Sequence, residues 1–351
     1  MLIARSIGYH CKSQCSYGEY KLISSTTSTN VYNNKMIGSS TLMQKVWHQI
    51  EIAGNCDVPV LLIGETGTGK EIAAKNIHRL SNRREKTFLP VNLGAIPESL
   101  ISSVLFGYEK GAFTGADRAQ SGIFEQGYDG TVFLDEIGNI DYKAQIGLLR
   151  LLEEKKFNRL GGKKEISTNA RIISASNENL DQKSKSGAFR EDLYYRLDVF
   201  CIKIPPLKDR LTDVPELINY FLAKFNHAMQ KQVKGVSNEV IQILQEYDWP
   251  GNVRELKNVI QRAIIVCEDE EINPLHLPPR FRDMGNINPV KNTVTFEIGT
   301  SLERVEKEMI LKALSVSHNN RTHAAELLGI SRRAIYNKLK KHDIQRSELL
   351  Q

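Results

Sequence analysis

Apolar runs of strand length alternate with helical periodicities through the middle of the chain. The runs lie at residues 58–63, 88–93, 131–134, 171–175 and 199–204. Segments with apolar residues at helical spacing lie before and between them, for example at residues 43–52, 71–80 and 144–152. Strands that alternate with helices form parallel sheets covered by helices on both faces. The pattern therefore predicts an α/β fold from residue 36 to residue 205.

The pattern changes after Pro205 and Pro206. Helical periods follow at residues 214–229, 239–247 and 253–267, and only helices are expected here. We therefore predict a small helical lid over residues 206–278. Turn-forming residues make 279–300 a predicted linker, and residues 301–346 form a predicted all-α domain. Residues 1–35 show no sustained period and include a run rich in Ser and Thr, which predicts a flexible tail.

Composition and charge narrow the range of functions. The 351 residues are enough for two or three domains. No apolar run is long enough to span a membrane, the first residues lack the pattern of a signal peptide, and the five cysteines are scattered. These features predict a cytoplasmic protein without a membrane partner. Between residues 318 and 346, seven basic residues stand against two acidic ones, which is +5 of the total formal charge of +6. Such a local excess predicts contact with nucleic acid.

A glycine-rich segment between the first predicted strand and the next helix carries the first chemical signal. It reads Gly64-Glu65-Thr66-Gly67-Thr68-Gly69-Lys70-Glu71. A strand, Gly-x-x-x-x-Gly-Lys and a helix are the context of a phosphate-binding loop, whose backbone N–H groups surround phosphate oxygens while the lysine reaches the outer phosphates. Glu71 stands where most such loops place a Ser or Thr hydroxyl on magnesium. The alternative is a plain glycine-rich turn, which the flanking strand and helix disfavour. The segment predicts nucleotide binding.

Two acidic residues follow the predicted strand at 131–134. A strand that ends in Asp135-Glu136 places carboxylates at the sheet edge where nucleotides bind. Asp135 is predicted to hold Mg2+ directly or through water, and Glu136 to orient and deprotonate the attacking water. A solvated acidic turn is the alternative, and a phosphate loop upstream favours catalysis.

A phenylalanine among small residues lies between these two segments. Residues 107–116 end in Gly111-Ala112-Phe113-Thr114-Gly115-Ala116. A Phe in a glycine-bounded loop fits neither a core nor an ordinary surface. The residues alone leave two interpretations open, a mobile tongue with one aromatic contact or a tight hairpin.

These three segments in this order resemble the AAA+ domain of bacterial sigma-54-dependent activators. The resemblance covers residues 36–279 and resumes in the C-terminal helices, and it rests above all on residues 111–116. It implies an ATPase that uses ATP and Mg2+, a contact of residues 111–116 with sigma-54 RNA polymerase, and self-assembly into a ring, a hexamer in the family. It also implies a form without an N-terminal receiver domain. The family often has an acidic residue at the position of Glu71.

The resemblance also assigns roles to individual residues. Asn92 matches the residue that switches the catalytic glutamate, although Leu93 and Gly94 replace the usual Cys-Ala. Its alternative role is to cap the turn after the strand. Ser176 and Asn177 match the sensor I position, with Ser in place of the more usual Thr.

Three arginines complete the set that the resemblance implies. Arg190 and Arg196 are candidates to reach the γ-phosphate of a neighbouring subunit, where guanidinium charge stabilises the transferring phosphoryl group. Surface salt bridges are the alternative for both. Arg254 matches sensor II, and we expect Asn252 to cap the helix and so direct Arg254 towards the nucleotide. An arginine supplied to a neighbour implies a ring, because head-to-tail contacts close only by rotation.

The basic C-terminal region predicts a helix-turn-helix. Ser301 is expected to cap a first helix, alanines at 324 and 325 allow close packing, Gly329 makes the turn and Ser331 caps the last helix. Ile335 and Leu339 are expected to face inward and Arg332, Arg333, Asn337 and Lys338 outward. This region resembles the Fis-type domain of the same activators, which binds double-stranded DNA at an upstream site. The predicted DNA contacts are Thr322, Ser331, Arg332, Arg333, Tyr336, Asn337 and Lys338. A basic, solvated helical hairpin is the alternative.

The nucleotide and DNA signals together with the resemblance imply an ATP-hydrolysing activator that remodels sigma-54 RNA polymerase and drives open-complex formation. One rival is a DNA-binding repressor that kept the ATPase fold, and relatives of that kind tend to have a degraded loop at residues 111–116. A second rival is a general protein-remodelling ATPase, which has no need of a domain that reads DNA. Promoter-specific, ATP-dependent opening of DNA separates all three.

Overall fold

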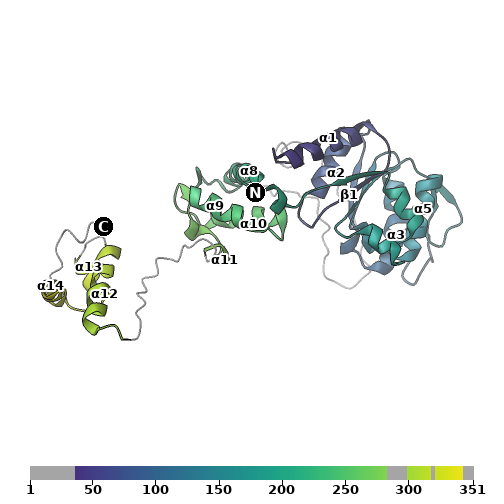
Figure 1. Cartoon of the computed structure of the whole chain (residues 1–351). Helices are drawn as coiled ribbons and strands as arrows, with labels where there is room; N and C mark the ends of the chain where they lie inside the picture. Colours follow the sequence, from purple (N-terminus) through teal and green to yellow (C-terminus); the bar gives the residue numbers. More distant parts are fainter. Residues whose placement is uncertain (1–35, 283–298, 318–320, 343–351) are drawn as a thin grey trace. The chain divides into compact units, whose positions relative to one another are not determined.

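The computed structural model describes residues 36–282, 299–317 and 321–342 (Figure 1). The chain divides into two compact units, residues 1–277 and residues 278–351. The predicted tail at residues 1–35, most of the predicted linker and the last residues of the predicted DNA-binding domain lie outside the described residues.

A five-stranded parallel sheet forms the centre of the first unit. Its strands are β1 (Val60–Ile63), β2 (Phe88–Asn92), β5 (Thr131–Asp135), β8 (Arg171–Ser176) and β9 (Phe200–Lys203), in the order β2-β5-β8-β1-β9. The five apolar runs are these five strands, so the predicted α/β fold is confirmed. All their carboxyl ends lie along one edge, because every neighbouring pair is parallel.

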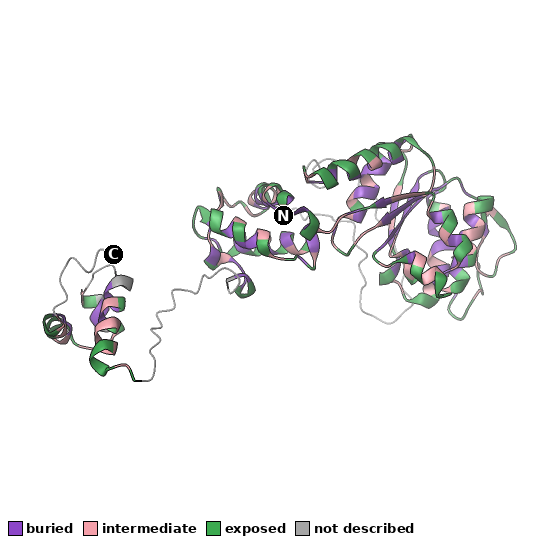
Figure 2. Ribbon diagram, viewed as in Figure 1, coloured by how far each residue is buried: buried purple, intermediate pink, exposed green. Residues whose placement is uncertain are grey.

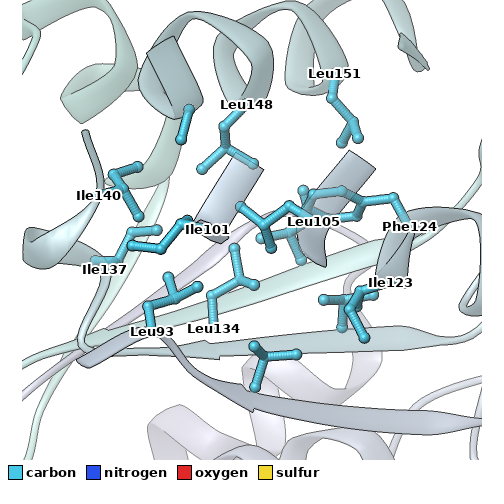
Figure 3. Packing of buried hydrophobic residues seen from close by; sticks show 14 of the residues in the cluster. Leu93, Ile101, Leu105, Ile123, Phe124, Leu134, Ile137, Ile140, Leu148 and Leu151 are labelled. Carbon is cyan, nitrogen blue, oxygen red and sulfur yellow. The ribbon is translucent and has the colours of Figure 1, made fainter. Parts of the chain in front are cut away.

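Helices cover both faces of this sheet, and successive residues of each strand face opposite layers. Helices α1 (Thr41–Asn55) and α2 (Lys70–Arg79) pack on one face against Val60, Leu62 and Phe133. Helices α3 (Glu98–Phe106) and α5 (Tyr142–Glu154) pack on the other against Leu61 and Leu134. Figure 2 shows the buried residues on the strands and the inner faces of the helices, and Figure 3 shows the second layer.

Shorter elements connect the main ones. They are α4 (Ile123–Gln126), α6 (Leu180–Lys185), α7 (Glu191–Leu197) and the 3-10 turns η1 (Leu93–Ala95) and η2 (Ile137–Asn139). Two small antiparallel hairpins are also present. One pairs β3 (Gly107–Tyr108) with β4 (Gln120–Ser121), where the sequence left a hairpin open. The other pairs β6 (Lys156–Asn158) with β7 (Glu165–Ser167) and was not predicted.

The lid follows the sheet and is mainly helical, as predicted. It contains η3 (Leu207–Asp213), α8 (Val214–Met229), α9 (Asn238–Glu246), α10 (Asn252–Val266) and η4 (Pro274–His276). The expectation of helices only was wrong in one detail, because β10 (Gly235–Val236) pairs in parallel with β11 (Glu271–Ile272). Two-residue strands are too short to show alternation. The fully buried Asp213 joins the lid to the start of the domain by accepting hydrogen bonds from Ser39 N (3.0 Å) and Ser40 N (2.8 Å).

The second unit contains α11 (Pro279–Arg282), α12 (Leu302–Val316), α13 (Arg321–Leu327) and α14 (Arg332–Lys341). Helix α11 lies where the predicted linker begins. The last three helices share a core of Ile310, Ala313, Leu314, Ala324, Ala325, Ile335 and Leu339. Gly329 makes the turn between α13 and α14 with a φ of +63°, and Ser331 Oγ caps α14 by accepting from Ala334 N at 3.2 Å. Throughout the described ranges, every helix is too short or too polar to cross a membrane.

Candidate functional site

The glycine-rich segment 64–71 forms a tight loop between β1 and α2. Gly67 and Gly69 have φ values of +82° and +108°, a region that side chains other than glycine rarely adopt. Thr68 Oγ1 braces the loop by donating to Glu65 O at 2.8 Å. Helix α2 begins at Lys70, so the loop lies at the positive end of a ten-residue helix. This is the arrangement that binds phosphate.

Lys70 occupies the inside of this loop. Its side chain is 8% exposed, and Nζ donates to Gly64 O at 2.7 Å and to Glu65 O at 3.2 Å. Burial lowers the pKa of Lys70, and the carboxylates of Asp135 and Glu136 oppose that shift. β1 and β5 end at the same edge of the sheet, so the loop that holds Lys70 and the acids after β5 share that edge.

Glu71 lies on the surface of the first turn of α2. It is exposed and forms an ion pair with Lys75 at 2.5 Å, one turn further along α2. Its carboxylate is thus part of an exposed helix surface, where such pairs contribute little to stability.

Asp135 ends β5 at the same edge of the sheet. Burial raises the pKa of its carboxyl group, and the charge of Lys70 opposes this. Its Oδ1 accepts from the backbone N–H of Glu136 at 3.1 Å. A half-buried carboxylate at a strand end suits a hard cation.

Glu136 has a left-handed backbone conformation, with a φ of +57°. Its Oε2 accepts from Asn139 Nδ2 at 3.0 Å. Asn92, the expected switch residue, instead accepts from Ala95 N at 3.2 Å and so caps the turn after β2. The structure therefore shows the alternative role of Asn92.

The predicted sensor I residues take different positions. Asn177 Nδ2 donates to Thr66 Oγ1 at 3.3 Å, which brings this side chain to the phosphate loop. The buried Ser176 hydroxyl is used locally, since it donates to Glu178 O at 2.9 Å and accepts from Glu178 N at 3.0 Å.

The lid contacts the loop through the start of α10, and here one prediction was wrong. Gly251, rather than Asn252, is the N-cap, and its backbone N–H donates to Glu255 Oε2 at 2.9 Å. The fully buried Asn252 has a φ of +51° and donates to Glu65 Oε2 at 3.0 Å and to Thr66 O at 3.2 Å. Its Oδ1 accepts from Leu207 N at 2.7 Å. Asn252 thus joins the loop, the lid entrance and α10.

Two lid arginines also lie beside the loop. The backbone N–H of Arg254 donates to Gly67 O at 3.3 Å, and its exposed side chain adds positive charge near Lys70. Arg210, which sequence reasoning missed, is 2% exposed and donates from Nη2 to Thr68 O at 3.3 Å. It follows Pro205 and Pro206 in a charged segment, and no sequence periodicity distinguishes it from its neighbours.

The two arginines that are candidates to reach a neighbouring subunit's γ-phosphate contact helix α5. Arg190 forms an ion pair with Asp192 at 2.6 Å and donates to the Tyr142 hydroxyl at 2.7 Å. The hydrogen bonds that Arg190 donates to Asp192 raise the pKa of Arg190. Arg196 forms an exposed ion pair with Glu153 at 3.0 Å. The structure therefore shows the salt-bridge alternative for both within one chain.

The segment 107–116 lies on a hairpin, one of the two interpretations left open by the sequence. A short hairpin, β3–β4, carries a loop in which Phe113 is 36% exposed. The Phe113 ring meets the Tyr108 ring edge-on with centroids 5.0 Å apart. Gly111 and Gly115 have positive φ values, and Ala112 lies against Gly161 of the neighbouring β6–β7 hairpin. The loop thus presents one aromatic side chain on a hairpin.

Helix α14 presents most of the predicted DNA contacts. Arg332, Arg333, Tyr336 and Asn337 are exposed. Arg321 lies over the Tyr336 ring at 5.0 Å, and hydrogen bonds from Arg321 and Arg332 lower the pKa of the Tyr336 hydroxyl. Lys338 is only partly exposed and forms an ion pair with Glu306 of α12.

Three family models match successive parts of the chain. The model described as the Sigma-54 interaction domain matches residues 36–203, and the AAA+ ATPase lid domain matches residues 208–293. The model of bacterial regulatory proteins of the Fis family matches residues 301–342.

Individual relatives agree with these matches. The chain is 42% identical to the transcriptional regulatory protein ZraR of Salmonella typhimurium over 304 residues, covering 87% of this chain and 68% of the relative. It is 42% identical to the phenol regulator MopR of Acinetobacter guillouiae over 311 residues, but spans only 56% of that protein's length. The crystal structure of NtrX from Brucella abortus in complex with ATP has a TM-score of 0.66 and 29% identity, covering 88% of this chain and 70% of that one.

Proposed function

The chain belongs to the sigma-54-dependent transcription activators, and on this premise we propose that it hydrolyses ATP to remodel sigma-54 RNA polymerase. This remodelling opens promoter DNA while the chain is bound at an upstream site. The observation that supports the proposal most is the convergence of Lys70, Asp135 and the lid residue Asn252 on one phosphate loop. The same chain carries a sigma-54 interaction domain and a Fis-type domain.

The phosphate loop is the proposed ATP site. Lys70 Nζ is bonded to two carbonyl groups of the loop and can exchange them for outer phosphate oxygens. Nucleotide contacts are assigned to residues 64–71, Ser176, Asn177 and Arg254. Arg254 and Asn252 lie at the start of α10, so ATP binding is expected to draw the lid and the loop together.

Asp135 is the proposed Mg2+ ligand. Among the residues that the structure describes, no cluster of three or more His, Cys, Asp or Glu side chains could hold a metal ion alone. This suits an ion shared between one carboxylate and the phosphates. Bound Mg2+ would supply charge neutralisation on those phosphates. Glu136, next in the chain, would orient the attacking water and accept its proton.

Arg190 and Arg196 are proposed to act on the nucleotide of a neighbouring subunit in a ring, which the family resemblance makes a hexamer. Both guanidinium groups lie against exposed acids, Asp192 and Glu153, which a neighbour's γ-phosphate can replace as partner. Loop residues 111–116 are proposed to contact sigma-54, and α14 to enter the major groove of DNA. A DNA-binding activator of this kind works in the cytoplasm.

Glu136→Gln tests the ATPase assignment. The variant should bind ATP as tightly as the wild type, because Lys70 and Asp135 remain, but its turnover should fall at least 100-fold on the scale of general base catalysis. Native turnover in this variant would remove Glu136 from the mechanism. Glu246→Gln, which makes the same chemical change at an exposed glutamate at the end of α9, is the matched control and should leave both affinity and turnover unchanged.

A further inference from the structure

The position of the Glu136 carboxylate depends on two residues to which the family resemblance gives no role. Asn139 Nδ2 donates to Glu136 Oε2 at 3.0 Å. Gly94 provides the space, because a Cβ at residue 94 would overlap Glu136 Oε2 and lie 2.9 Å from Glu136 Cδ. Any side chain at residue 94 would therefore displace this carboxylate.

The strand order shows in which direction the carboxylate points. Gly94 follows β2, and β2 lies on the opposite side of β5 from β8 and β1. The phosphate loop follows β1, two strands and about 10 Å from β5. A Glu136 carboxylate that lies against Gly94 is thus directed away from the loop. The charge of Glu136 still raises the pKa of Lys70, against the larger effect of burial.

The two turns that surround the Glu136 carboxylate, η1 and η2, are both anchored. Leu93 of η1 and Ile137 of η2 are buried in the hydrophobic layer between the sheet and helix α3 (Figure 3). Lys183 of α6 holds the second turn by donating to Gly138 O at 3.1 Å. Lys183 also forms an ion pair with Glu178, which directly follows the Asn177 that contacts the phosphate loop. Nucleotide contacts at Asn177 are thereby connected to the segment that carries Asn139.

We propose that Gly94 and Asn139 form a holding position for the Glu136 carboxylate and set how often it is available to activate water. Asn92 does not perform this task in the structure, because its side chain caps η1. Gly94 and Asn139 are positioning residues that act through Glu136. The proposal rests on the proposed function, since it requires Glu136 to be the residue that activates water.

The test compares Gly94→Ala and Asn139→Ala with the wild type in single-turnover ATP hydrolysis, at protein concentrations where assembly is complete. Release of the carboxylate should raise the hydrolysis rate about 3- to 10-fold. The rate is proportional to the fraction of molecules in which the Glu136 carboxylate has left the holding position and can activate water. The KM for ATP should change less than about twofold, since neither residue contacts the loop. A residue with only a structural role would lower the rate instead.

Controls separate this proposal from the function on which it rests. Gly235→Ala adds a methyl group in open space, and Asn55→Ala removes an exposed amide from the end of α1, so both should leave the rate unchanged. In a Glu136→Gln background, Gly94→Ala and Asn139→Ala should have no effect. Active Glu136→Gln protein refutes the proposed function. Inactive Glu136→Gln together with an unchanged or lower rate in Asn139→Ala overturns the holding position alone, even if Gly94→Ala fails to fold.

Discussion

Asn252 should be a main determinant of how the lid is joined to the phosphate loop, and Asn252→Ala tests this. The substitution leaves the buried N–H of Leu207 without its acceptor, which costs about 1–3 kcal/mol. Alanine at a φ of +51° adds about 1 kcal/mol of backbone strain. The hydrogen bond to Glu65 is partly exposed and adds little. The free energy of unfolding should therefore fall by about 2–4 kcal/mol.

Urea unfolding followed by tryptophan fluorescence measures this change. The two tryptophans, Trp47 and Trp249, both lie in the first unit, so the signal does not report the C-terminal helices. Asn252→Gly loses the same hydrogen bonds without the strain and should recover about 0.5–1 kcal/mol relative to alanine. A loss below about 0.5 kcal/mol in Asn252→Ala would refute the reasoning, because a change of that size is typical of unconnected surface sites.

Three further predictions concern assembly, DNA binding and the separation of the two units. Mixing Arg196→Ala with Lys70→Ala subunits should restore part of the ATPase activity, since each supplies what the other lacks, and hybrid rings without rescue would contradict a role in a neighbouring subunit. If Arg332 reads a guanine edge, Arg332→Ala should cost about 1–3 kcal/mol of binding free energy and relax selectivity at that one operator base. If Arg332 contacts phosphate, the variant should bind all duplexes more weakly to the same extent, and the salt slope of binding should fall by about one. Anisotropy titrations on operator and random duplexes at several salt concentrations distinguish the two. A chain ending at Thr300 should still hydrolyse ATP but lose operator affinity, and full operator affinity would overturn the domain assignment.

The sheet could be predicted from sequence because each buried strand is a continuous apolar run. The phosphate loop and the acids after β5 could be predicted because their chemistry depends on residues close together in sequence. Contacts between distant segments could not. Asn252 has the residue type of a helix cap, but its left-handed backbone turns the side chain towards Glu65 and Thr66. The pairing of Lys338 with Glu306, 32 residues away, likewise depends on how α12 and α14 pack.

The side-chain position of Glu136 was also beyond sequence reasoning. The sequence shows Gly94 in place of the usual Ala. The consequence of this replacement depends on how the turns η1 and η2 pack around the Glu136 carboxylate. No sequence pattern distinguishes Arg210, because its hydrogen bond to Thr68 O depends on how the lid packs against the phosphate loop.

Promoter opening by sigma-54 RNA polymerase tests the central claim most directly. Permanganate reactivity of unpaired thymines is measured on a sigma-54 promoter with an upstream site, with ATP or a non-hydrolysable analogue, for the wild type and for Phe113→Ala. The wild type should open the DNA only with ATP. Phe113→Ala should hydrolyse ATP but leave the DNA closed, because Phe113 lies in the exposed hairpin loop outside the nucleotide site. Opening by the wild type without hydrolysis, or at wild-type levels by Phe113→Ala, would contradict the account.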